Sequence, residues 1–317
     1  IERQIVGGPH RRTLAHMQTA AGDTTIGHTL AYCQVCEALA ATRVPARAQV
    51  IRGIALELER LANHTGDLGA LAGDVGFLPT QNYCGAIRGD FLNMTAMLCG
   101  SRLGRDLLRP GGTVFDLDPQ RVERLHRSFD KAEKEVTGAV DLLFGASSVL
   151  ARFEETGVLD RETAQAMGLV GPAARACGLR QDVRLDHPAG IYQVHHLPVC
   201  TWHTGDVLAR ATVRWLEIQQ SIRFIRELLQ GLPPDRPAVS PCPLRPNHVA
   251  VALAEGWRGE ICHVAVTDEN GCFRRYKIVD PSFHNWFALA LALRGQAISD
   301  FPLCNKSFNL SYCGVDL

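Results

Sequence analysis

The segment of residues 46–71, ARAQVIRGIALELERLANHTGDLGAL, restricts the fold more than any other feature of the sequence. It is mostly apolar at helical spacing, which suits a helix buried among other helices. Glu57, Arg60 and His64 stand at i, i+3 and i+7, and therefore share one face. Because buried charges must pair, we expect a polar network inside a helical bundle. This network either locks neighbouring helices together or has a proton-conducting or redox-coupled role.

Four other segments predict long helices. Asp23 and Thr24 are capping residues at the start of one of them, and the PGG run at 110–112 ends another. The charged pattern of alternating sign at 119–144 favours an outward face. The predicted helices cover residues 23–43, 83–108, 119–144 and 205–230. The fold class is therefore mainly α, a bundle of long helices with a small antiparallel β appendage.

The sequence pattern changes from helical to β-rich after Pro246. β-rich runs flank a turn at residues 268–271, which predicts a small antiparallel hairpin. One short helix and a loop-like tail rich in Asn, Ser and Pro follow. We expect a helical body at 1–245, a hairpin insertion at 246–280, and a C-terminal helix and tail at 281–317.

Composition restricts the partners and the cellular compartment that we expect for the protein. The 33 basic and 33 acidic residues cancel, which gives no global field to attract nucleic acid or an anionic membrane surface. Charged residues or glycines interrupt every apolar run before membrane-spanning length. The 11 scattered cysteines favour a reducing cytoplasm over a disulfide framework. Because the chain starts at Ile1, we expect an upstream segment to be missing.

Two local patterns could bind a metal. Cys33 and Cys36 form a CxxC in a predicted helix, where two small buried residues are the alternative. A second group, which could bind zinc or form ordinary polar contacts in a loop, consists of His195, His196, Cys200 and His203. Phosphate-loop, HExxH, GxSxG and dinucleotide fingerprints do not occur, so nothing indicates nucleotide or NAD binding by this chain.

Longer runs carry a family resemblance. They include GDTTIGHTLAYCQ (22–34), VPARAQVIRGIALELERLANHTGDLGAL (44–71), GDVLARATVRWLEIQQSIRFI (205–225), EGWRGEICHVAVTD (255–268) and DFPLCNKSFNLSYCGVDL (300–317). In this order they resemble the large subunit of [NiFe] hydrogenases of the membrane-associated, complex I-like group and the 49 kDa subunit of respiratory complex I. The resemblance implies their helical fold.

In hydrogenases of this group, two cysteine motifs supply four thiolates to nickel and iron, soft ligands that suit these metals. The resemblance places these positions on residues that are not cysteines: Ala21, Thr24, Ser311 and Gly314. Cys304 and Cys313 stand out of register. The family's glutamate and arginine before the first cysteine fall on Gln18 and Thr19. The resemblance therefore implies no nickel-iron centre and no hydrogen turnover.

In complex I, the corresponding cavity is similar in position to the quinone headgroup site. The resemblance implies that the first loop and the returning C-terminal tail line it here, through Gly22, Asp23, Thr24, His28, Ser311 and Tyr312. The quinone-contacting tyrosine of complex I falls on Gly22. His28 and Asp23 are the candidate catalytic residues, because a histidine can donate a hydrogen bond or proton to a ligand. A satisfied histidine at a helix start is the alternative for His28.

Two functional hypotheses follow. In the first, the chain is a subunit of a complex I-like oxidoreductase related to NADH:quinone oxidoreductases, and a partner iron-sulfur small subunit passes electrons to quinone or another acceptor. No cofactor is expected on this chain, which lies in the cytoplasm, peripheral on the inner face of the membrane through its partners. In the second, it is a catalytically silent scaffold of such a complex. A zinc-binding helical domain would require the resemblance to be accidental.

Overall fold

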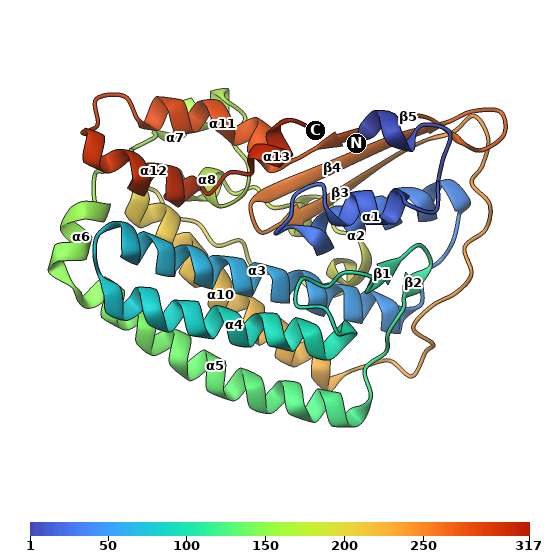
Figure 1. Ribbon diagram of the computed structural model, residues 1–317, viewed down its shortest axis with the longest axis horizontal. Coiled ribbons are helices and arrows are strands. Elements are labelled where there is room, and N and C mark those ends of the chain that lie inside the picture. The colour runs from blue at the N-terminus through green and yellow to red at the C-terminus, as the bar shows by residue number, and fades with distance from the viewer.

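The computed structural model describes residues 1–317 and is built around five long helices. These are α2 (Thr25–Ala40), α3 (Ala46–Asp74), α4 (Leu78–Cys99), α5 (Pro119–Gly145) and α10 (Val207–Gln230). Figure 1 shows α3, α4, α5 and α10 stacked below the sheet, with α5 at the outer edge. The predicted bundle of long helices is confirmed, and the charged helix lies at its rim as expected.

The third of these helices is displaced from its predicted range. α4 begins at Leu78, earlier than the prediction, because Pro79 is accommodated in the first turn of the helix. It ends at Cys99, where Gly100 adopts a φ of +78°. Residues 101–107, predicted as helix, therefore form turns and loop.

The predicted small antiparallel β appendage is confirmed, and it has three strands where a hairpin was predicted. Strands β3 (Val249–Gly256), β4 (Gly259–Thr267) and β5 (Phe273–Val279) form an antiparallel sheet in that order. The predicted turn at 268–271 connects β4 to β5. There Asp268 accepts hydrogen bonds from the N–H groups of Asn270 and Cys272, each at 2.9 Å.

The short C-terminal helix is confirmed as α11 (Pro281–Ala292). The tail after it is partly helical where a loop was predicted, because it contains α12 (Phe301–Phe308) and α13 (Tyr312–Val315). Pro281 and Pro302 lie in the first turns of their helices, where the missing N–H costs nothing, and the Ser311 side chain accepts a hydrogen bond from the N–H of Gly314 to cap α13. The residues that suggested a loop are therefore helix-start residues.

The remaining elements are short. They are η1 (Glu2–Ile5), α1 (Thr13–Gln18), β1 (Leu108–Arg109), β2 (Gly112–Thr113), α6 (Ser147–Phe153), α7 (Arg161–Ala166), α8 (Gly171–Ala176), α9 (Val183–Asp186), η2 (Gly190–Gln193) and η3 (Ile298–Asp300). The segment after η1 extends the sheet, because Gly7 donates to Phe273 O at 2.7 Å and Phe273 donates to Gly8 O at 2.6 Å.

Of three hydrophobic clusters, the two larger ones hold most of the fold together. The larger one joins the long helices to the sheet, and the smaller one packs α7 and α8 against α11 and α12. No single helix has both the length and the apolar character to cross a membrane; α5 and α6 meet these criteria only as a pair bent by 77°. The division of the chain at residues 245 and 280 stays a prediction.

Candidate functional site at the first loop and C-terminal segment

The turn between β3 and β4 brings Trp257 and Arg258 to the first loop, residues 21–24. Gly259 has a φ of +132°, a conformation that favours glycine and lets the chain reverse within two residues. Trp257 Nε1 donates to Asp23 O at 3.0 Å, and the Arg258 guanidinium lies 3.9 Å from the centre of the Trp257 ring. The sheet thus positions an arginine at the loop.

Arg258 joins the first loop to the C-terminal segment. Its Nη1 and Nη2 donate to the two Asp23 carboxylate oxygens at 2.6 and 2.7 Å, and Nη1 donates to Thr24 Oγ1 at 3.2 Å. Its Nε donates to the backbone oxygen of Asn309. Burial raises the pKa of Asp23, but the hydrogen bonds and charge of Arg258 outweigh burial and lower it overall. Asp23 is therefore a carboxylate at neutral pH.

The start of α2 is fixed by a residue of another helix. Thr24 is the N-cap but makes no side-chain capping bond, contrary to expectation. Instead Glu59 of α3 accepts hydrogen bonds from the N–H groups of Ile26 at 2.6 Å and Gly27 at 3.1 Å. The first loop is thus held from α3 as well as from the sheet.

His28 belongs to a buried chain of hydrogen bonds. Its Nε2 lies 2.9 Å from Asp280 Oδ2, and its Nδ1 lies 3.1 Å from His263 Nε2; His263 Nδ1 lies 2.9 Å from the Tyr276 hydroxyl. Burial lowers the pKa of His263 well below its ordinary value, so this ring is neutral. A neutral His263 can donate toward either His28 or Tyr276, so the chain can adopt two hydrogen-bond polarities. His28 itself is fully buried and does not face solvent.

The structure places the predicted cavity residues in different environments. Ala21 and Thr24 are buried, whereas Gly22 is exposed and the Tyr312 side chain packs on Trp286 with an edge-to-face geometry. Ser311 N donates to Ser282 Oγ at 2.9 Å, which ties the tail to α11. Gly314 packs so closely on Asp280 that an added Cβ would stand 2.5 Å from its carboxyl carbon. The loop and tail therefore meet through Arg258 and Asp280.

These residues do not fit a nickel-iron centre. None of the four proposed ligand positions offers a thiolate, and a cysteine side chain at residue 314 would collide with Asp280. Cys313 is exposed, whereas Cys304 lies beside Gly157 and outside this site. No group of three His, Cys, Asp or Glu side chains in residues 1–317 is arranged to hold a metal ion.

The two local metal patterns form other contacts. Cys33 and Cys36 are buried in α2, and burial raises the pKa of both thiols, to about 12 for Cys36. Cys200 Sγ lies 3.2 Å from Gln220 Oε1, and His203 stacks on Trp202. These side chains make packing and polar contacts.

Glu57, Arg60 and His64 lie in one buried network. Arg60 Nε donates to Glu57 at 3.1 Å, and both Arg60 Nη1 and His64 Nε2 contact Glu217 Oε2 of α10, at 3.4 and 2.8 Å. Tyr192 and Ser221 donate to Glu57 at 2.7 and 2.6 Å. Two ion pairs from Arg184 to Glu57 and from Arg175 to Glu217 extend the network.

The sequence interpretation missed several residues of these clusters. Arg258 and Glu255 lie in the quoted run EGWRGEICHVAVTD, so the resemblance included them without assigning a role, and Asp280 was given no role either. Their partners are far away in the chain: 235 residues separate Asp23 from Arg258, and 252 separate His28 from Asp280. Helical periodicity contains no information on such pairs.

The sequence profile of the family described as "Respiratory-chain NADH dehydrogenase, 49 Kd subunit" matches residues 74–243, more than half of the chain. The chain belongs to this family.

Relatives with assigned names support this membership. The carbon monoxide-induced hydrogenase of Rhodospirillum rubrum is 32% identical over 89% of this chain and 78% of its own length. An NADH-quinone oxidoreductase subunit of Clostridium beijerinckii is 32% identical over 86% of this chain and 74% of its own length. Formate hydrogenlyase subunit 5 of Escherichia coli is 31% identical over 91% of this chain, which spans 51% of that protein. The relatives are thus subunits of complex I-like oxidoreductases and hydrogenases.

A solved structure shares the fold. A chain of the membrane-bound sulfane sulfur reductase, an archaeal respiratory membrane complex, superposes with a TM-score of 0.93 at 24% sequence identity. The match covers 100% of this chain and 88% of that chain. The helical bundle with its small sheet is therefore a fold that a chain of that complex also has.

Proposed function

We propose that this chain is a subunit of a complex I-like oxidoreductase in which a partner iron-sulfur subunit passes electrons to an acceptor at the surface around Asp23 and Arg258. The observation that supports this most is the Arg258 contact to both Asp23 and Asn309, because it unites the first loop and the tail without a metal. Quinone is the acceptor class we propose. Two electrons from the partner and two protons would convert it to quinol.

The chemistry of Arg258 suits such an acceptor. A guanidinium has five N–H groups, and four contacts from Arg258 to protein oxygens leave one N–H of Nη2 for an acceptor oxygen. The Asp23 side chain is 38% exposed and adjoins this guanidinium, so it could exchange protons with a bound ligand. His28 is fully buried, and we assign it a positioning role through Asp280 instead of contact with the acceptor.

We infer the location of the iron-sulfur centres and of the chain from the relatives. Iron-sulfur centres would belong to the partner, since the site residues of this chain offer no thiolate set. The chain would lie in the cytoplasm on the inner face of the membrane, attached through other subunits.

A scaffold role is the second candidate, and one observation favours it. The void between Asp23, Glu59, Asn63 and neighbouring residues is only about 20 Å³, room for roughly one water molecule. An acceptor headgroup would therefore need space supplied by the partner surface over the exposed residues Gly22 and Tyr312. Without that space, this chain would only join its neighbours.

The test uses the complex purified with its native partners from gently solubilised membranes. Quinone reduction would be compared between the unchanged protein, Asp23→Asn and the surface control Glu123→Gln, whose pair with Arg127 is exposed. We expect at least a tenfold loss for Asp23→Asn and no change for the control. If the intact complex does not reduce quinone, or if all three proteins reduce it at equal rates, the scaffold role is the candidate that remains. Recovery without an iron-sulfur partner would contradict both candidates.

A further inference from the structure

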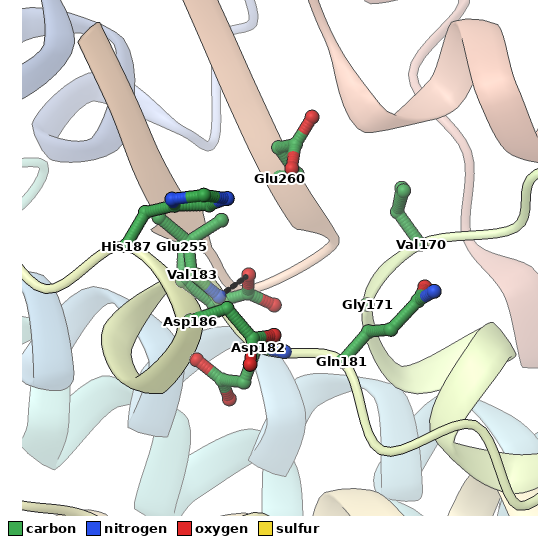
Figure 2. Close-up of a pocket in the computed structure, with 9 residues that line it drawn as sticks. All are labelled: Val170, Gly171, Gln181, Asp182, Val183, Asp186, His187, Glu255 and Glu260. Atoms are coloured by element: carbon green, nitrogen blue, oxygen red, sulfur yellow. Dashed lines mark hydrogen bonds between the residues drawn. The ribbon is translucent and has the colours of Figure 1, made fainter.

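A pocket of about 330 Å³ opens beside the buried network, on the side of the sheet that α8 and α9 cover. Its volume admits many water molecules. Figure 2 shows Glu260 above Glu255, with His187 on one side and Gln181 and Val170 on the other. Four of the lining residues are acidic: Asp182, Asp186, Glu255 and Glu260. Asp182 and Glu255 belong at the same time to the buried network.

The charges of this network do not balance. Direct ion pairs connect four carboxylates, those of Glu57, Asp182, Glu217 and Glu255, with three guanidinium groups, those of Arg60, Arg175 and Arg184. The neighbouring Arg214 is already paired with Asp67 at 2.8 Å. A net negative charge in a buried network is costly, so one additional proton would neutralise the network.

His64 does not carry that proton in this arrangement. Its Nε2 contacts Glu217, but its Nδ1 is buried without a hydrogen-bond partner. A protonated ring would therefore bury an N–H group with no acceptor, whereas a neutral ring that donates from Nε2 leaves only an unused lone pair. The proton must then lie on a carboxylate.

Three of the four carboxylates are held in the ionised state by their donors. Glu57 accepts from Arg60, Arg184, Tyr192 and Ser221. Asp182 accepts two hydrogen bonds from the Arg184 guanidinium, at 2.9 and 2.6 Å. Glu217 accepts from arginine side chains and from His64. Accepting several charged or buried donors favours the ionised form.

Glu255 has the fewest donors. Its Oε1 accepts from Arg175 Nη1 at 2.8 Å, and its Oε2 accepts only the backbone N–H of Val183 at 3.1 Å, the bond dashed in Figure 2. Glu255 is also directly opposite Glu260 in the β3–β4 register, where two like charges repel. Of the four carboxylates, Glu255 therefore gains least from ionisation.

We propose that Glu255 is a proton-exchange site, which takes a proton from water in the pocket and returns it there, and so switches the buried network between a neutral and a singly negative state. The proton passes from a hydronium ion or buffer acid to a Glu255 carboxylate oxygen, and no bond is oxidised or reduced. This inference goes beyond electron transfer and does not depend on the identity of the acceptor.

Charged groups from every neighbouring element face Glu255. They are Arg175 of α8, Asp182 before α9, Arg184 of α9, Arg60 of α3, Glu217 of α10 and Glu260 of β4, with Asp186 and His187 at the pocket rim. Burial and the negative charge of Asp182 raise the pKa of Glu255 to about 7, in spite of the nearby arginines. The exchange would thus occur near neutral pH.

Infrared difference spectroscopy of the purified complex between pH 5.5 and 8.5 tests this proposal without any electron transfer. The measurement follows the carbonyl band of protonated carboxyl groups. We expect a band with a midpoint near pH 7 in the unchanged protein and in the control Glu269→Gln, which lies in the exposed β4–β5 turn. In Glu255→Gln the component with a midpoint near pH 7 should be absent, whereas a component from Glu59, whose pKa burial raises to about 8, should remain. The Glu255 component should persist in Glu260→Gln with a midpoint at lower pH, since the opposing charge is removed.

Three results would overturn the proposal. The first is a component with a midpoint near pH 7 that persists unchanged in Glu255→Gln, and the second is the lack of any such component in the unchanged protein. The third is failure of Glu255→Gln to assemble at every pH, because glutamine has the shape and neutrality of the protonated acid. Failure of quinone reduction alone would bear only on the proposed electron-transfer function.

Discussion

The guanidinium of Arg258 and the carboxylate of Asp23 form a two-pronged ion pair, with N–O distances of 2.6 and 2.7 Å. Because each nitrogen meets a different oxygen, the two contacts fix the orientation of the carboxylate relative to the guanidinium. The same guanidinium reaches the C-terminal segment through its Nε. One side chain from a strand turn therefore organises two segments that are far apart in the chain.

Arg258→Lys should separate these segments although it keeps the charge. A lysine ammonium cannot reproduce the planar fork, so we expect the free energy of unfolding to fall by about 1.5–3 kcal/mol. Denaturant unfolding of the full chain measures this loss. Arg274→Lys, at an exposed position of β5, is the matched control and should stay within about 0.5 kcal/mol of the unchanged protein. Equal stability of the two variants would contradict the organising role of Arg258.

Gly314→Ala should destabilise the tail, because the new Cβ would stand 2.5 Å from the Asp280 carboxyl carbon. Overpacking of this kind costs about 1–3 kcal/mol. Gly22→Ala provides the control, since an added Cβ there meets nothing within 4 Å. Thermal unfolding of both variants checks the prediction, and a Gly314→Ala protein as stable as Gly22→Ala would show that the tail packs differently.

Glu57→Gln should be the most damaging single change in the buried network. It would leave Arg60 and Arg184 partly unpaired at a fully buried position, and breaking a buried ion pair costs about 3–5 kcal/mol. Glu123→Gln breaks an exposed pair with Arg127 and should cost less than about 1 kcal/mol. Denaturant midpoints of the two variants measure the contrast; similar midpoints would mean that the network contributes little to stability.

The stability of the chain should depend on pH through Glu255. Its pKa is raised in the folded protein to about 7 from an ordinary value of 4.5, so the folded state binds its proton more tightly than the unfolded state. This stabilisation is present at low pH and is lost as the pH rises through 7, by up to about 3 kcal/mol. As the pH rises from 5 to 8, the unfolding free energy of Glu255→Gln should therefore increase relative to that of the unchanged protein. A constant difference would show that Glu255 does not titrate in this range.

The sequence predicted the helical architecture because local patterns determine it. The apolar spacing of residues 46–71 predicted a helix that the structure contains as α3, and the predicted helix at 205–230 is α10. Asp206 caps α10 by accepting a hydrogen bond from Ala209 N at 2.8 Å. The tail was misjudged because Pro302 and Ser311 are as typical of loops as of helix starts.

The candidate site could be predicted only in part. The first loop and the tail were expected to meet, but the residues that join them, Arg258 and Asp280, depend on how the sheet and α11 pack. In the buried network, Glu57, Arg60 and His64 were visible as one helix face, whereas Glu217 and Glu255 come from elements that no periodicity relates to α3. Such contacts arise from tertiary structure alone.

The pairing of Gly7 and Gly8 with Phe273 has a consequence for self-association. These two hydrogen bonds occupy part of the outer edge of β5, which would otherwise present free N–H and C=O groups. The N-terminal residues therefore shield a strand that could recruit the same strand of another molecule. Shortening the chain past Gly8 would remove this shield and favour edge-to-edge aggregation, even with the helical bundle intact.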